Sequence, residues 1–167
     1  MRIKILSIFA VLALLTACET APDEGGSSSG AGGSSATSGS GAGPRAGTQE
    51  DLVVNVGDRV FFGFNKFKLS AAARATLDKQ SAWLKKHGSV TVVIEGHADE
   101  RGTREYNLAL GERRANSAKD YLVTLGVSPS RIKTISYGEE RPVALGSSEK
   151  SWSQNRRSVS VVSRPAS

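Results

Sequence analysis

The sequence predicts an α/β protein, built as an α+β two-layer sandwich in which a mixed four-stranded sheet carries its helices on one face. Segments with strand-like alternation and segments with helical periodicity follow one another along the second part of the chain. Their order is strand, helix, strand, helix, strand and, after a connecting segment, a fourth strand. Residues 50–167 are enough for one domain with a single core, and nothing in the sequence indicates a second domain.

The first half of this domain is predicted from alternation and from helix-end signals. Residues 59–64 predict the first strand, and residues 71–87 predict the first helix. Ser70 is a typical N-cap for this helix, and Gly88 follows its last residue as expected at a C-terminal end. Alternating residues in the segment 90–95 then predict the second strand.

The second half contains the longer helix. Helical periodicity predicts this helix at residues 104–125, with Gly126 ending it. Two further strands are predicted from alternation, at residues 132–137 and 158–163. The segment 138–155 between them is left unassigned, with room for a short helix near residues 148–151.

The first 17 residues have the features of an export signal. Arg2 and Lys4 precede an apolar run at residues 5–17. This run is shorter than the roughly 20 residues needed to cross a membrane. Its basic flank and the small residue before Cys18 are typical of a signal peptide that is removed. Residues 1–17 are therefore predicted to be a signal peptide.

Cys18 is the only cysteine, and its position after Leu-Thr-Ala resembles the bacterial lipobox. That resemblance implies a covalent diacylglycerol and an N-acyl lipid on Cys18, and no other cofactor is expected. Because Glu19 rather than Asp follows the cysteine, it also implies sorting to the outer membrane. The alternative is an incidental cysteine beside an ordinary cleavage site.

The segment after the cysteine predicts a flexible tether. Residues 25–47 are almost wholly Gly, Ser and Ala, a composition that cannot bury a core and should stay disordered. The roughly 28 residues from Glu19 to Ala46 span about 30 Å on average as a flexible coil and about 95 Å when extended. We therefore divide the mature chain into a lipidated N-terminus with a disordered tether at residues 18–49 and a folded domain at residues 50–167.

The charge of the chain is modestly basic. Loss of Arg2 and Lys4 with the signal lowers the formal net charge from +6 to +4. The remaining basic residues alternate with acidic ones along the helices, which is typical of solvated faces. We therefore expect no nucleic acid as a partner, and an exported chain meets a better anionic partner in the carboxylates of the cell wall.

A glycine-punctuated acidic loop at residues 96–102 leads into the longer helix. On that helix, Asn107, Leu110 and Arg114 recur on one face. The chain from Asp99 to the helix start spans up to about 17 Å, and Arg114 lies about 15 Å along the helix. A carboxylate and a guanidinium can therefore line one pocket and bind a zwitterion. Taken as an isolated pair, the two have a simpler interpretation, in which Asp99 caps the loop and Arg114 is exposed.

The ordered strings GHADERG, YN and LGERRAN, followed by SYGEERP and NRR, favour the pocket. They closely resemble the OmpA-like peptidoglycan-binding domain family and, within it, the peptidoglycan-associated lipoproteins, over residues 58–162. The resemblance implies that Asp99 and Arg114 hold the diaminopimelate of the peptidoglycan stem peptide. Asn107 and Leu110 are assigned to the same site from their helical face. Replacing Asp99 or Arg114 should weaken binding while folding survives.

One strand motif departs from the family. Its usual FGFD reads FGFN here, so that Phe64 is followed by Asn65 instead of Asp. Asparagine keeps hydrogen-bonding capacity but loses the charge. Phe64 and Asn65 complete the predicted peptidoglycan-binding set. The arginines of NRR, Arg156 and Arg157, are interpreted as supporting the fold and are left outside the site.

His97 beside Asp99 raises the alternative of a metal or acid–base site. Zinc sites usually need three or four protein ligands, and the only other histidine, His87, ends a different helix. We therefore predict no metal, and a structural His97 that is hydrogen-bonded within its loop. No nucleophile motif is recognisable, so no catalytic residues are assigned. Trp83 is expected in or near the core.

Together these features predict a lipid-anchored outer-membrane protein whose periplasmic domain binds peptidoglycan without cleaving it. The resemblance implies membership of the Tol-Pal system, with its periplasmic propeller protein as a partner, and a role in envelope integrity and outer-membrane constriction at cell division. Two alternatives remain open. One is an envelope enzyme that modifies the wall, and the other is an OmpA-like domain of another lipid-anchored complex, of stator or adhesin type.

Overall fold

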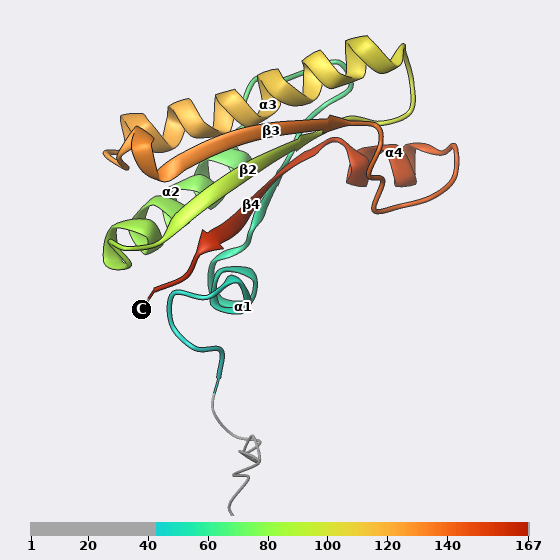
Figure 1. The fold of residues 1–167 in the computed structure, drawn as a ribbon. Helices are drawn as coiled ribbons and strands as arrows, with labels where there is room; N and C mark the ends of the chain where they lie inside the picture. Colours follow the sequence, from blue (N-terminus) through green and yellow to red (C-terminus); the bar gives the residue numbers. More distant parts are fainter. Residues whose placement is uncertain (1–42, 167) are drawn as a thin grey trace, which may run out of the picture. The chain divides into compact units, whose positions relative to one another are not determined.

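The computed structural model describes residues 43–166. The predicted signal peptide, Cys18 and most of the predicted tether lie outside this range. Within it the chain forms a mixed four-stranded sheet with the strand order β1-β4-β2-β3 (Figure 1). The strands are β1 (Arg59–Phe61), β2 (Thr91–His97), β3 (Ile132–Gly138) and β4 (Arg157–Arg164). Strands β2 and β3 are parallel, and the other neighbours are antiparallel.

Two long helices, α2 (Ala71–Lys86) and α3 (Arg104–Thr124), contact each other and pack on the sheet. Ser70 caps α2 by accepting a hydrogen bond from the backbone N–H of Ala73, and Thr103 caps α3 in the same way. The core between helices and sheet is built mainly from alternate residues of β2 and the inner faces of both helices, including Val92, Ile94, Leu77, Leu84, Ala118 and Leu122. The predicted fold class is confirmed, and the two helix predictions are correct to within one residue at their ends.

The first strand is shorter than predicted. It ends at Phe61 rather than at residue 64 because the chain turns immediately afterwards. The backbone N–H of Lys66 donates to the carbonyl of Gly63 at 3.1 Å. Asn65 lies in this turn with a φ of 53°, in the left-handed region that asparagine adopts more readily than most residues.

The second strand, β2, is longer than predicted and runs to His97 rather than to residue 95. The predicted short helix exists as α4 (Glu149–Asn155), capped by Ser148. The 3-10 helix η2 (Pro129–Arg131) begins where Ser128-Pro129 predicts a cap followed by a proline at the first helical position. A three-residue helix α1 (Gln49–Asp51) and a π-helix η1 (Leu52–Val56) were not predicted, because neither is long enough to show a clear hydrophobic period. In the part of the chain that the structure describes, no helix has the length and apolar character needed to cross a membrane.

The folded unit begins before the predicted boundary at residue 50. The side-chain oxygen of Gln49 accepts a hydrogen bond from the backbone N–H of Val162 in β4 at 2.7 Å. Gly47 accepts one from the N–H of Ala166 and donates its own N–H to the carboxylate of Asp51. Residues 47–49 therefore belong to the domain, beside the end of β4.

A pair of glycines sets the distance between α3 and the sheet. A Cβ on Gly96 would lie 1.8 Å from the carbonyl oxygen of Gly111, and a Cβ on Gly111 would lie 2.3 Å from the hydroxyl of Ser136. Only glycine therefore allows this approach. The contact brings the side chain of Arg114, one turn further along α3, beside the end of β2.

Candidate functional site

All six residues predicted to bind the ligand line one pocket of about 190 Å³. They come from the turn after β1, the loop after β2 and helix α3. The predicted set is Phe64, Asn65, Asp99, Asn107, Leu110 and Arg114. The structure adds three lining residues that sequence reasoning did not select, Arg101, Gly102 and Tyr106. All three lie within the strings GHADERG and YN, so the motif contained the signal for them.

Arg114 lies at the base of this pocket and is fully buried, with 0% of its surface exposed. The interpretation of Arg114 as an exposed arginine is therefore wrong. Its Nε donates to the carbonyl of Lys66 at 2.9 Å, Nη1 to that of His97 at 2.7 Å, and Nη2 to that of Gly63 at 3.2 Å. The guanidinium thus ties the turn after β1 to the end of β2.

The charge of Arg114 has no acidic partner close by. Among residues 43–166, no carboxylate oxygen lies within 4.0 Å of its guanidinium. Burial lowers the pKa of Arg114 to about 10, although the more distant Asp99 opposes this change. The group stays charged at neutral pH. Its three hydrogen bonds use only part of the donors of an arginine side chain, which leaves N–H groups for a bound anion.

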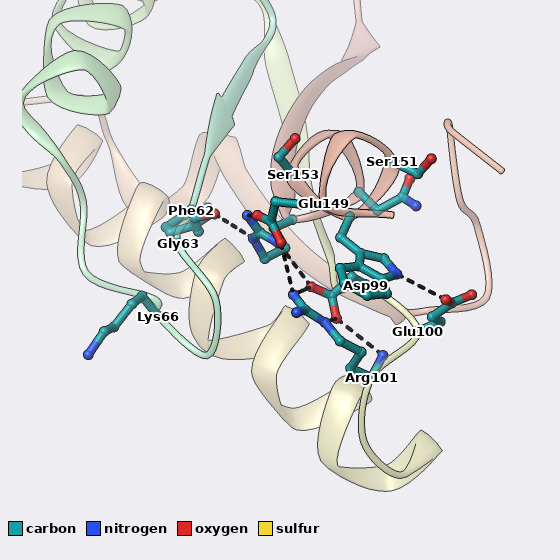
Figure 2. Close-up of polar contacts among 12 residues, drawn as sticks. Phe62, Gly63, Lys66, Asp99, Glu100, Arg101, Glu149, Ser151 and Ser153 are labelled. Atoms are coloured by element: carbon teal, nitrogen blue, oxygen red, sulfur yellow. Dashed lines mark hydrogen bonds and ion pairs between the residues drawn. The ribbon is translucent and has the colours of Figure 1, made fainter. Parts of the chain in front are cut away.

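Asp99, the predicted anionic partner, lines the same pocket without forming an ion pair with Arg114. Its side chain is 4% exposed and pairs with Arg101 and Arg156 instead, as Figure 2 shows for the Arg101 contacts. Burial by itself raises the pKa of Asp99, but the hydrogen bonds from the two arginines outweigh this effect and hold the pKa below its usual value. Asp99 is therefore a charged group inside the pocket wall.

Arg156 was predicted only to support the fold, but it also contacts Asp99 of the pocket. Its side chain is buried, and Nε donates to the carbonyl of Phe62 at 3.0 Å. Nη1 donates to Asp99 at 3.2 Å, and Nη2 donates to Glu149 of α4. Arg156 therefore holds the carboxylate of Asp99 in place. The two residues are 57 positions apart along the chain, so no local sequence pattern indicates their contact.

Two polar contacts hold residues that line the pocket, one to another lining residue and one to a residue outside the pocket. The hydroxyl of Tyr106 donates to the side-chain oxygen of Asn65, and the side-chain amide of Asn107 donates to Glu139. Asn65 thus serves as the acceptor for Tyr106 and adopts the left-handed backbone of the turn. Both of these functions are available to asparagine without the charge of an aspartate.

His97 does not make the hydrogen bonds predicted for it. The side chain is 1% exposed, and neither ring nitrogen has a hydrogen-bond partner among the described residues. An oxygen of Glu95 lies 3.6 Å from Nε2. Burial, followed by the positive charges of Arg157 and Arg141, lowers the pKa of His97 to about 3, so the ring is neutral near pH 7. His97 contributes to the site through its carbonyl, which binds Arg114.

Within residues 43–166, no group of three or more His, Cys, Asp or Glu side chains lies close enough together to hold a metal ion. Trp83 is buried in the core, as predicted, and its Nε1 donates to Asp51 at 2.8 Å. The geometry is that of a binding pocket formed by a buried cation, a buried anion and an apolar wall.

Known proteins are similar to this chain in sequence and in fold. Residues 61–156 match the OmpA family. The chain is 57% identical over 116 residues to the peptidoglycan-associated lipoprotein of Rhizobium meliloti, covering 70% of this chain and 66% of that protein. It is 55% identical over 117 residues to the protein of the same name from Mesorhizobium japonicum, covering 70% of each. The aligned region thus spans about two thirds of the length of these relatives.

Solved structures agree with the fold. The crystal structure of the peptidoglycan-associated lipoprotein from Burkholderia pseudomallei has a TM-score of 0.62 and 42% sequence identity, covering 63% of this chain and 89% of that one. The C-terminal domain of Helicobacter pylori MotB has a TM-score of 0.61 with 21% identity, covering 65% of this chain and 86% of that one. At this lower identity the similarity shows the fold alone.

Proposed function

Because this chain belongs to the OmpA family, we propose that it is an outer-membrane lipoprotein whose folded domain binds peptidoglycan non-covalently through the diaminopimelate of the stem peptide. One observation carries this proposal. The pocket contains a fully buried arginine without a nearby acidic partner, and a buried aspartate lines the same cavity. An uncompensated buried charge is costly, so an anionic ligand group at Arg114 would be strongly favoured.

The chemistry of diaminopimelate fits these groups. Its free end carries an ammonium and a carboxylate on the same carbon. The guanidinium of Arg114 can donate charge-assisted hydrogen bonds to the carboxylate, and Asp99 supplies the opposite charge for the ammonium. Leu110 and the ring of Phe64 provide apolar surface for the methylene chain. The chain is a binding protein and not an enzyme.

The position of the pocket suits an anchor at the N-terminus. Residues 47–49 contact Val162 near the end of β4 and Ala166 just beyond it. Arg156, beside the pocket, immediately precedes the start of the same strand. A strand of this length spans roughly 25 Å. Within the domain, the pocket therefore lies at the end of β4 that is opposite to the contacts of residues 47–49.

The anchor itself is proposed to be the lipid on Cys18. Cys18→Ala is expected to abolish incorporation of a labelled fatty acid and to release the protein from the outer-membrane fraction, because no other cysteine is present and several acyl chains are needed for firm retention. Metabolic labelling followed by membrane fractionation measures both effects. Label that persisted in the alanine variant would rule out this anchor.

We also propose that the protein acts in the Tol-Pal system, with the periplasmic propeller protein of that system as a partner, in envelope integrity and in outer-membrane constriction at division. The resemblance of the motifs supports this. Co-purification with Tol components from cross-linked cells tests it. If only components of a different envelope complex were recovered, the alternative of another lipid-anchored assembly would be favoured.

Asp99→Asn tests the binding site directly. The change keeps the size of the side chain and removes the charge that the ligand ammonium requires. We expect a loss of about 1.5–3 kcal/mol in binding, which corresponds to about tenfold to a hundredfold in affinity. Co-sedimentation with purified peptidoglycan measures this loss, and release of soluble wall fragments in the same assay would reveal an enzyme instead.

Asp78→Asn is the matched control. Asp78 lies on α2, accepts a hydrogen bond from Tyr121 and does not line the pocket. This variant should co-sediment like the wild-type protein. If a folded Asp99→Asn protein also co-sedimented like the wild type, the pocket would not be the peptidoglycan site.

A further inference from the structure

The side chain of Arg101 covers the side of the Asp99 carboxylate that faces the pocket. Its Nε donates to Oδ1 at 3.2 Å and its Nη2 to Oδ2 at 2.6 Å, and its backbone N–H donates to Oδ1 at 3.2 Å (Figure 2). Arg156 adds a fourth donor, on Oδ2. A carboxylate accepts about four hydrogen bonds. The acceptor capacity of Asp99 is therefore already filled by this chain itself.

Two aromatic rings hold the guanidinium of Arg101 in place. Its central carbon lies 4.1 Å from the ring centroid of Phe64 and 4.0 Å from that of Trp152. Trp152 is itself fixed by a hydrogen bond from its Nε1 to Glu100 at 2.9 Å. Cation–π contacts of this kind favour a charged group between the rings, so Arg101 is held at the pocket wall rather than free in solvent.

A second carboxylate lies within reach of the same guanidinium. Nη2 of Arg101 is 3.8 Å from an oxygen of Glu149, whose side chain is 65% exposed. Arg101 itself is 29% exposed on its side chain. A small rotation toward Glu149 would keep its charge paired while releasing Asp99.

We propose that Arg101 occupies the cation position of the pocket in the free protein, and that the ammonium of a bound ligand takes its place on Asp99 while Arg101 moves to Glu149. This inference rests on the proposed function and concerns the selectivity of the same site. Two guanidinium donors and a ligand ammonium cannot share the pocket-facing side of a carboxylate that is 4% exposed. Arg101 is thus an internal competitor, which lowers the affinity only for ligands that carry an ammonium.

Arg101→Gln tests this competition in the purified mature lipoprotein in detergent. Isothermal titration would use two synthetic stem tripeptides, one ending in meso-diaminopimelate and the other in 2-aminopimelate, which keeps the distal carboxylate and lacks the distal ammonium. We expect the variant to bind the diaminopimelate peptide about fivefold more tightly than the wild type, the equivalent of about 1 kcal/mol. Its affinity for the aminopimelate peptide should be unchanged or lower.

Arg113→Gln is the matched control, because Arg113 also stacks on aromatic rings, those of Phe67 and Tyr106, but does not contact Asp99. It should bind both peptides like the wild type. Equal or weaker binding of the diaminopimelate peptide by folded Arg101→Gln would overturn the inference. Failure of the wild type to bind this peptide would instead overturn the proposed function, and the inference with it.

Glu149→Gln provides a second, independent test. It should weaken binding of the diaminopimelate peptide by about twofold in the wild type, because displaced Arg101 loses its acceptor. In the Arg101→Gln background the part of this loss that comes from Arg101 should be absent, so the loss should be smaller. Glu149 also pairs with Arg156, but that contribution is present in both backgrounds and cancels in the double-mutant cycle. Equal losses in the two backgrounds would overturn the proposed movement to Glu149.

Discussion

Gly96→Ala is expected to destabilise the domain by about 3 kcal/mol or more, since it forces a methyl group into a contact that has no space for it. The new Cβ would lie 1.8 Å from the carbonyl oxygen of Gly111. The Cβ is bonded directly to the backbone of β2 and the carbonyl oxygen belongs to the backbone of α3, so neither can move aside without separating α3 from β2. The same separation would displace Arg114, and we expect the remaining folded protein to lose peptidoglycan binding.

Urea denaturation followed by circular dichroism measures this effect. Gly88→Ala is the matched control, because a Cβ at Gly88 would meet nothing within 4 Å. This substitution should change the free energy of unfolding by no more than about 0.5 kcal/mol. A Gly96→Ala protein as stable as the control would show that α3 does not depend on this close approach.

Arg114→Met is expected to remove ligand binding and to lower the free energy of unfolding by about 2 kcal/mol. Methionine fills much of the same volume but donates no hydrogen bonds. The carbonyl of His97 would then lose its donor in a buried place, and a buried unpaired group costs about 1–3 kcal/mol. The carbonyls of Gly63 and Lys66 lose less, because both residues are exposed and Gly63 keeps the N–H of Lys66. Relief of the buried charge offsets part of this cost. The sequence alone predicts that folding is unaffected by the loss of Arg114. Because the structure shows this side chain to be buried, we expect the variant to be less stable instead.

Arg113→Met serves as the control, since its side chain stacks on the rings of Phe67 and Tyr106 and does not line the pocket. Stability is measured by urea denaturation, and binding is measured at a temperature where both variants are folded. Arg114→Lys should bind more weakly than the wild type, because an ammonium cannot form the paired contacts of a guanidinium. Wild-type stability of Arg114→Met would show that the three carbonyl contacts contribute nothing to the fold.

The sequence by itself determined the order of the main elements and six of the nine residues that line the pocket. The two long helices, α2 and α3, were predicted within one residue because their periods and caps are local, as Ser70 before α2 illustrates. The loop with Asp99 and the helical face with Asn107 and Arg114 were also readable, since spacing along one helix fixes which side chains share a side. These features depend on residues only a few positions apart.

Only the tertiary structure decided how the charges of the pocket are arranged. Arg114 binds the carbonyl of Lys66, 48 positions away, and Asp99 is held by Arg156, 57 positions away. The sequence likewise placed His97 in a hydrogen-bonded loop, whereas packing leaves its ring without a partner. Hydrogen bonds and burial between distant segments depend on how closely those segments pack. Here that distance is set by the contact of Gly96 with Gly111, which no local pattern encodes.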